Sequence, residues 1–284
     1  MFMKLLETHL QVMGKQYPFM FAFQSGPDSQ WPEERKAARL TVSGLTKEEY
    51  DKKQQSVTYQ AGLDDMEKLL AKANAENLNA VQEEFDVVDS EEETVDISFP
   101  IPNPSLLPDR IVTSVSPVII IRHPMFTLPS FARASAVYQG TVFDSDFVIM
   151  TTFRWQRMIY DFYRAYYDKI NPEGKKNWPI VIDGDRLVKD TQGQVKKFCA
   201  IVGLDESQVQ YSWEASNDEM DKAGSAFVGA IAASTCVIRG LDASSTTLEE
   251  QVKKWTEEWD EKVAQKIKEQ VESSMEDYRI SPEI

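Results

Sequence analysis

The chain has 284 residues, of which 42% are hydrophobic, and carries a formal net charge of −15. A chain of this length can bury a large core, and we predict a single domain over residues 1–284. The negative charge argues against nucleic acid and anionic membranes as partners, because their phosphates would be repelled. The two cysteines, Cys199 and Cys236, provide neither a disulfide framework nor a metal-ligand cluster, so we expect no metal.

No stretch of the chain reaches the roughly 18 apolar residues that a membrane-spanning helix needs. The N-terminal residues also lack the basic segment and unbroken apolar run of a secretion signal. We therefore expect a cytoplasmic protein without membrane contacts. A small molecule is the expected partner, and the sequence leaves the oligomeric state open.

Helical patterns dominate the first third of the chain. Apolar residues at helical spacing predict an opening helix that contains His9, and residues 19–23 predict a short strand. Thr46 and Glu49 form a capping-box pattern, which predicts a helical insert or lid over residues 46–84. Residues 83–96 hold eight acidic side chains and no basic one, so we predict a solvated loop there.

An apolar run that ends in an arginine is the most informative segment. Residues 118–121 read Val-Ile-Ile-Ile, which is typical of a strand covered on both faces, and Arg122 follows directly. Pro124 and Pro129 end the strand and open a helix, so we expect Ser130 in its first turn. Strand carboxyl ends and helix N-termini attract anions. Arg122 and Ser130 therefore predict an anion site, with phosphate as the natural ligand.

Aromatic side chains crowd a predicted long helix over residues 146–169. They either line a pocket for a flat aromatic molecule or pack in the core, which is the more frequent use of such residues. Four arginines lie in the same part of the chain. We expect ordinary surface and ion-pair roles for them, namely for Arg133, Arg154, Arg157 and Arg164.

The last third supplies a second strand and two capped helices. Residues 180–182 predict the strand, and Asp190 and Gly203 mark the ends of the helix that follows. Thr247 and Glu250 form a capping box for a last helix to about residue 271. This order predicts a three-layer α/β domain, with a mainly parallel sheet, flanking helices and right-handed crossovers.

Two motifs in this order resemble a known family. The segment Ile-Ile-Arg-His-Pro at residues 120–124, with Ser130 eight residues after Arg122, resembles the 3′-phosphate-binding segment of sulfotransferases. Residues 178–205 are similar to the strand, acidic loop and helix that follow it, especially in the filamentous-fungal branch. The resemblance covers residues 100–270 or so. It implies a P-loop-type fold and 3′-phosphoadenosine 5′-phosphosulfate as donor, bound by Arg122 and Ser130. The pair Arg239-Gly240 resembles a closing loop of the family, which implies a third contact from Arg239.

Two parts of the family pattern are missing from this chain. The loop that holds the phosphosulfate does not precede the opening helix, so either residues upstream supply it or the protein has lost it with its strand. Where family enzymes carry a catalytic histidine, this chain reads Thr94-Val-Asp-Ile-Ser-Phe-Pro, and its histidines are His9 and His123. Asp96 would be a feeble base for an alcohol, so the catalytic residues stay unknown.

Three functions remain open at this point. The first is a sulfotransferase that acts on a hydroxyl group of a small, aromatic secondary metabolite. The second is a repurposed enzyme that performs a donor-independent cyclisation, isomerisation or dehydration in a biosynthetic pathway. The third is a non-catalytic binding protein or an inactive relic. Binding of adenosine 3′,5′-bisphosphate that depends on Arg122 would distinguish the first from the other two.

Overall fold

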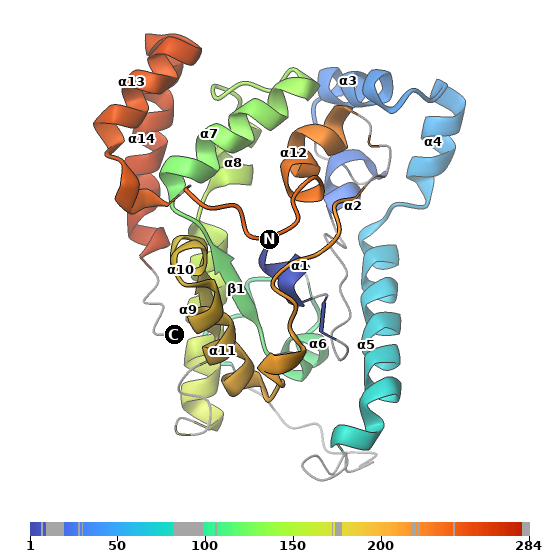
Figure 1. Cartoon of the computed structure of the whole chain (residues 1–284). Coiled ribbons are helices and arrows are strands. Elements are labelled where there is room, and N and C mark those ends of the chain that lie inside the picture. The colour runs from blue at the N-terminus through green and yellow to red at the C-terminus, as the bar shows by residue number, and fades with distance from the viewer. Residues whose placement is uncertain are drawn as a thin grey trace.

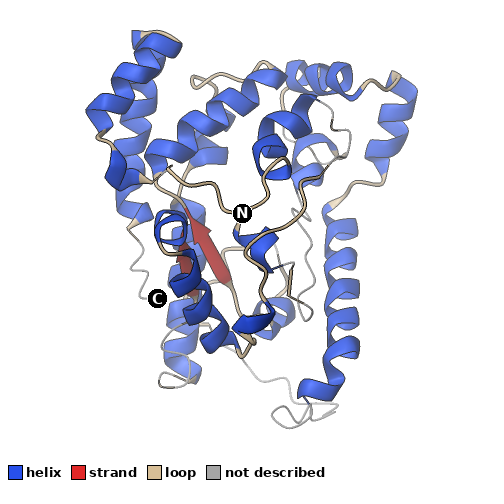
Figure 2. Ribbon diagram, in the orientation of Figure 1, coloured by secondary structure: helices blue, strands red, loops and turns tan. Residues whose placement is uncertain are grey.

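The structure is a computed structural model. It describes residues 1–6, 8–9, 20–27, 29, 31–81, 99–105, 107–171, 173, 178–216, 220, 222–240 and 242–279. Most of these residues are helical, and a small sheet lies among the helices (Figure 2). The predicted acidic loop over residues 83–96, which includes Asp96, lies outside the described residues.

The described chain runs through helices, two strands and three short 3-10 turns. Its first part comprises α1 (Phe2–Leu6), α2 (Met20–Ser25), α3 (Glu33–Ser43), α4 (Lys47–Gln55), α5 (Tyr59–Val81), α6 (Asp109–Ser114), β1 (Val118–Ile121), α7 (Pro124–Ser135), η1 (Ala136–Tyr138) and α8 (Ser145–Thr151). Its second part comprises α9 (Arg154–Ile170), β2 (Ile180–Asp183), α10 (Gly184–Lys189), α11 (Thr191–Val202), η2 (Glu206–Gln208), α12 (Lys222–Ala232), η3 (Ala243–Ser245), α13 (Leu248–Glu258) and α14 (Glu261–Tyr278).

The two strands lie side by side in parallel, with Val118 opposite Ile180 and Ile121 opposite Asp183. Helices flank this sheet, so the predicted α/β fold with a parallel sheet is confirmed. Within the described residues the sheet has two strands. Because the strands are parallel and in register, Arg122 and Asp183 come to the same carboxyl edge, where the sequence predicted a site.

Helices cover the sheet on both sides (Figure 1). On one side, α1, α10 and α11 pack against the strands through a core that includes Leu5, Ile180, Ile182, Val195 and Phe198. On the other side, side chains of α9 and the end of α14 contact the strands in a smaller cluster of Ile119, Ile121, Val181, Ile159 and Tyr278. The alternation of these contacts along each strand is the period of two expected of a pleated strand.

Ile120 departs from the prediction that residues 118–121 are covered on both faces. It is 44% exposed, whereas Ile119 and Ile121 are buried. In the described residues β1 pairs only with β2, so it forms one edge of the sheet, and helix packing does not reach across Ile120. A continuous apolar run is therefore not proof of a strand buried on both faces.

Several predicted elements differ from the observed ones. The backbone at residues 20–25 forms α2 instead of the predicted strand, which shows that a short apolar run does not distinguish strand from helix. The opening helix ends at Leu6, so His9 lies beyond this helix, although the His9 side chain is buried.

The capping box of Thr46 and Glu49 is confirmed at the start of α4, and a break before Tyr59 separates α4 from α5. The role of this region as a lid stays a prediction.

Two long predicted helices are each divided in two. The aromatic helix breaks at Thr152 and Phe153, between α8 and α9. The last helix breaks at Trp259, where Asp260 accepts a hydrogen bond from the Val263 amide (2.8 Å) and so starts α14. The predicted caps Asp190, Gly203 and Thr247 are confirmed.

A second core fixes α7 over the carboxyl edge of the sheet. Helices α7, α8, α13 and α14 meet in a cluster that contains Met125, Leu128, Phe147, Trp255 and Ile267. Leu128 and Ile267 are fully buried, and burying a side chain of this size contributes about 1.5–3 kcal/mol. This packing holds the N-terminus of α7 where β1 ends.

Candidate anion-binding site

The candidate site begins with Arg122, the residue that directly follows β1. Gly184 lets the two strand ends approach, since a Cβ atom there would lie 3.2 Å from the Ile121 carbonyl oxygen and 3.6 Å from Arg122 Cβ. The guanidinium carbon of Arg122 lies 5.5 Å from the centre of the Phe126 ring. Burial lowers the pKa of Arg122, and the charge of Asp185 opposes this shift.

Among the described residues, no hydrogen bond or ion pair holds the Arg122 guanidinium. The other arginines of this part of the chain do have carboxylate partners, as predicted. The pairs are Arg133 with Glu258 (2.6 Å), Arg154 with Asp277 (3.5 Å), Arg157 with Asp161 (2.9 Å) and Arg164 with Asp168 (2.6 Å). Arg122 thus differs from its neighbours in lacking a counter-charge in contact.

The contact with Phe126 does not compensate the burial of Arg122. A cation–π contact contributes about 0.5–2 kcal/mol. Removing an ion from water costs several kcal/mol unless a partner charge or hydrogen bonds replace the water. A partly buried guanidinium without such partners is electrostatically incomplete, and a bound anion would complete it.

The N-terminus of α7 lies directly beside Arg122. His123 caps this helix, because its Nδ1 accepts a hydrogen bond from the Met125 amide (3.2 Å). Burial lowers the pKa of His123, while Asp185 and Asp183 act in the opposite direction. A neutral imidazole agrees with its role as an acceptor at Nδ1. His123 therefore serves the local structure of the site.

Two aspartates near Arg122, Asp183 and Asp185, accept hydrogen bonds from other groups of the protein. Asp183 accepts hydrogen bonds from the Asp185 amide (2.7 Å) and from the Tyr278 hydroxyl (3.1 Å), which ties the end of α14 to β2. Asp185 accepts a hydrogen bond from the Ala243 amide (3.0 Å). Burial raises the pKa of Asp185, so the structure disfavours its charged form. Neither carboxylate forms an ion pair with Arg122 among the described residues.

A cleft of about 180 Å³ opens beside Arg122, between the end of β1, α7 and the junction of α8 with α9. Its polar lining residues are Arg122, Thr127, Thr151, Thr152 and Gln156. Phe131 and Phe153 supply flat apolar walls. Ligand pockets usually exceed roughly 300 Å³, so this cleft suits one chemical group of a larger molecule.

The structure does not bring the three sequence-predicted site residues together. Arg122 lines the cleft, as expected. Ser130 is the seventh residue of α7, so its predicted place in the first turn was wrong, and it is exposed and absent from the cleft lining. Arg239 is also exposed and lines a separate depression of about 290 Å³ with Lys189 and Cys236.

The aromatic residues of α9 mostly serve the core. Phe162, Tyr163, Tyr166 and Tyr167 are buried in one cluster, and the Tyr163 hydroxyl donates to the Val112 carbonyl (2.9 Å). These residues do not line the cleft, so the core alternative is confirmed for them. Phe153, at the helix start, is the aromatic residue of this region that lines the cleft.

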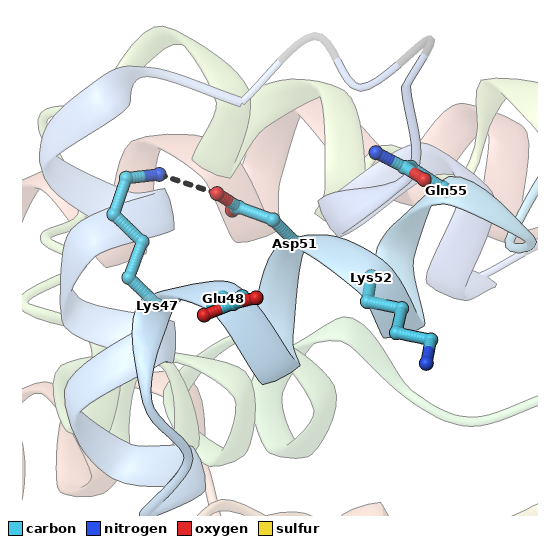
Figure 3. A pocket seen from close by; sticks show the side chains of 5 residues that line it. All are labelled: Lys47, Glu48, Asp51, Lys52 and Gln55. Carbon is cyan, nitrogen blue, oxygen red and sulfur yellow. Dashed lines mark hydrogen bonds and ion pairs between the residues drawn. The ribbon is translucent and has the colours of Figure 1, made fainter.

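A larger depression on the surface of α4 is a poor candidate for a site. Figure 3 shows this depression of about 500 Å³, which is lined by residues of α4 alone. Its Lys47 and Asp51 form an exposed ion pair (2.7 Å) at the i,i+4 spacing common on helix surfaces. Another depression, of about 310 Å³, contains Arg35, which already pairs with Asp144 and Asp146.

Sequence reasoning missed Gln156, which the fold brings into the cleft with Arg122. In the sequence it is one polar residue at the start of an amphipathic helix. The signal that points to it is its spacing of three from Phe153, which puts both on one helix face.

The fold and the cleft together define an α/β protein with a candidate anion site at the carboxyl edge of a parallel sheet. Comparison with known proteins adds two similar fungal proteins. The protein named Sulfotransferase ppzF of Metarhizium majus is 28% identical over 186 residues, and its namesake of Metarhizium rileyi is 25% identical over 185 residues. The chain is thus similar, over part of its length, to two fungal proteins that are named as sulfotransferases.

Each of these two alignments covers 62% of this chain and 54% of the relative. The chain therefore spans about half the length of the curated relatives it matches. No family model matches the chain, and no solved structure matches it. None of the described helices is both long and apolar enough to cross a membrane.

Proposed function

We propose that this protein binds 3′-phosphoadenosine 5′-phosphosulfate through Arg122 and transfers the sulfuryl group to a hydroxyl of a small aromatic molecule. The observation that carries the proposal is the Arg122 guanidinium, which is partly buried at a strand end without a partner among the described residues. The names of the two relatives support the reaction class. The two Phe side chains of the cleft support a flat group near the anion.

The size of the cleft limits what Arg122 can hold. A space of about 180 Å³ accommodates a phosphate with its immediate neighbours, while the rest of a nucleotide extends outside it. Arg122 would then bind the 3′-phosphate inside the cleft, and the 5′-phosphosulfate would lie outside the cleft. Guanidinium groups suit this role because they donate two hydrogen bonds to a phosphate in a fixed geometry.

Sulfuryl transfer would form a bond from the acceptor oxygen to sulfur and break the bond from sulfur to the bridging phosphate oxygen. Adenosine 3′,5′-bisphosphate leaves, and the proton of the acceptor hydroxyl passes to a base. We assign no residue to this role. His123 is not proposed, because its Nδ1 already accepts from Met125 and it does not line the cleft.

Calorimetric titration with adenosine 3′,5′-bisphosphate tests the proposal. We expect micromolar binding by the wild-type protein and loss of binding in Arg122→Ala. Arg154→Ala is the matched control, because it removes the same charge from an exposed residue of α9 that does not line the cleft. Binding that is lost only in Arg122→Ala supports nucleotide binding, and incubation with the sulfuryl donor and phenolic acceptors then tests the transfer.

The same titration decides between the proposal and its alternatives. A folded wild-type protein that binds no nucleotide would contradict donor-dependent transfer. The donor-independent enzyme and the non-catalytic protein would then remain. Turnover of an aromatic hydroxyl compound without any donor would favour the enzyme over the binding protein.

A further inference from the structure

The Gln156 side chain is an unexplained polar group in the wall of the cleft. Its Oε1 atom is buried, and no hydrogen-bond partner contacts it among the described residues. A buried amide oxygen without a partner costs about 1–3 kcal/mol of stability. Such a cost is typical of residues kept for a ligand.

The other polar groups of the lining are largely engaged in the local structure. The Thr127 hydroxyl donates to the Arg122 carbonyl (3.1 Å), and the Thr151 hydroxyl donates to the Phe147 carbonyl (2.7 Å). The Thr152 hydroxyl accepts from the Arg154 amide (3.2 Å). The Thr152 hydroxyl still has its own hydrogen to donate. Among the nitrogen groups of the lining residues, the Gln156 amide and the Arg122 guanidinium have hydrogen-bond donors to spare within the described structure.

We propose that Gln156 binds the same anion as Arg122, by donating a hydrogen bond from its amide nitrogen. Because Oε1 is buried, the Nε2 group is the end of the side chain that can face a ligand in the cleft. Both residues line one cleft of about 180 Å³, so a single anion bound there is expected to contact both. This inference rests on the proposed function, and it gives Gln156 the place that the family resemblance implies for Ser130.

The substitution Gln156→Met separates a ligand-binding role from a structural one. Methionine has a similar length and no hydrogen-bonding amide. We expect the affinity for adenosine 3′,5′-bisphosphate to fall at least roughly tenfold, the effect of losing one hydrogen bond to a charged group. We also expect the ligand-free variant to melt about 2 °C or more above wild type, because the unpaired buried oxygen is gone.

Two further variants make the comparison specific. Gln265→Met is the matched control, since Gln265 is exposed on α14 and bonds only Glu269 in the described structure. It should change neither affinity nor melting temperature. Ser130→Ala tests the rival residue. A loss of affinity in Ser130→Ala with none in Gln156→Met would overturn the inference.

A second substitution covers the case in which Gln156→Met does not fold. Gln156→Glu keeps the shape of the side chain and puts a carboxylate beside Arg122. Nucleotide binding should be weaker at neutral pH and recover as the pH is lowered and the carboxylate is protonated. Weak binding that does not recover would contradict the proposal.

The outcomes for the inference and for the proposed function are distinguishable. Binding that depends on Arg122 but not on Gln156 overturns this inference alone. A wild-type protein without affinity for the nucleotide overturns both. A lower melting temperature for Gln156→Met with unchanged affinity would show that Gln156 serves the packing of α9.

Discussion

At the residue scale, Asp185 has a structural role close to the strand end that holds the candidate site. The residue is 9% exposed, and one carboxylate oxygen accepts from the Ala243 amide while the other has no described partner. Burial raises its pKa, and the hydrogen bond from the Ala243 amide and the charge of Arg122 only partly oppose this. The segment before α13 is thus tied to the sheet by an acid whose charged form is disfavoured by burial.

This shift predicts a pH dependence of stability. Because the folded pKa of Asp185 lies above the unfolded one, the folded state binds its proton more tightly, and stability falls as pH rises from the ordinary aspartate range through the raised pKa. Asp185→Asn removes this titration and still offers an acceptor to Ala243. The free energy of unfolding of Asp185→Asn minus that of the wild type should therefore increase with pH over that interval and then level off. Urea unfolding at several pH values between about 4 and 7 measures the difference. A difference that does not vary with pH would contradict the assignment.

At the residue scale, the sequence predicted one of the two candidate anion-binding residues, Arg122, but not the other, Gln156. Arg122 could be placed because an apolar strand positions whatever residue follows it. Gln156 could not, because its approach to Arg122 depends on how α9 packs on the sheet, which no local pattern encodes. The role predicted for Ser130 rested on an expected place in the first helical turn as well as on the resemblance, and the helix start at Pro124 puts Ser130 farther along α7.

At the scale of elements, side-chain caps decide where the helices begin. Thr46, Asp190 and Thr247 each accept a hydrogen bond from a backbone amide in the first turn of the next helix. For Asp190 the bond to the Gly193 amide is 3.0 Å long, and it starts α11, the helix that covers one side of the sheet. The cap therefore supports the packing on which the strand end depends.

The Asp190 cap yields a prediction for stability. Asp190→Ala leaves an amide of the first turn without its partner, so the free energy of unfolding should fall by about 1 kcal/mol. Asp190→Ser is the matched control, because serine caps about as well as aspartate, and it should remain close to wild type. Denaturant unfolding of the three proteins measures the effect. Equal losses in both variants would point to the charge of Asp190 instead of its cap.

Caps also explain which helix starts could be predicted from the sequence and which could not. Where a capping pattern stood before an apolar periodicity, the predicted helix start was correct. The breaks at Phe153 and Asp260 were missed because the apolar periodicity continues across them, although Asp260 caps the start of α14. The strand predicted at residues 19–23 failed because four or five apolar residues fit either period.

At the scale of the whole molecule, the net charge of −15 opposes the binding of an anion. The opposition acts at long range and is screened over about 8 Å at physiological ionic strength. The attraction of the Arg122 guanidinium acts at contact distance in a partly buried cleft and is screened much less. An acidic protein can therefore hold an anion locally, and its affinity will depend on Arg122 far more than on the overall charge.

A comparison of salts tests this local anion site in the intact protein. Sulfate resembles phosphate in shape and charge, and an anion that binds only the folded state stabilises it by about 1 kcal/mol once its concentration is several times its Kd. We expect a larger free energy of unfolding in sodium sulfate than in sodium chloride at equal ionic strength. Sulfate also stabilises proteins through exclusion from their surfaces, so the informative quantity is how much of this increment disappears in Arg122→Ala. Arg154→Ala has the same net charge and should keep the full increment. If both variants retain it, sulfate acts on the protein surface as a whole, and the strand end does not form an anion site.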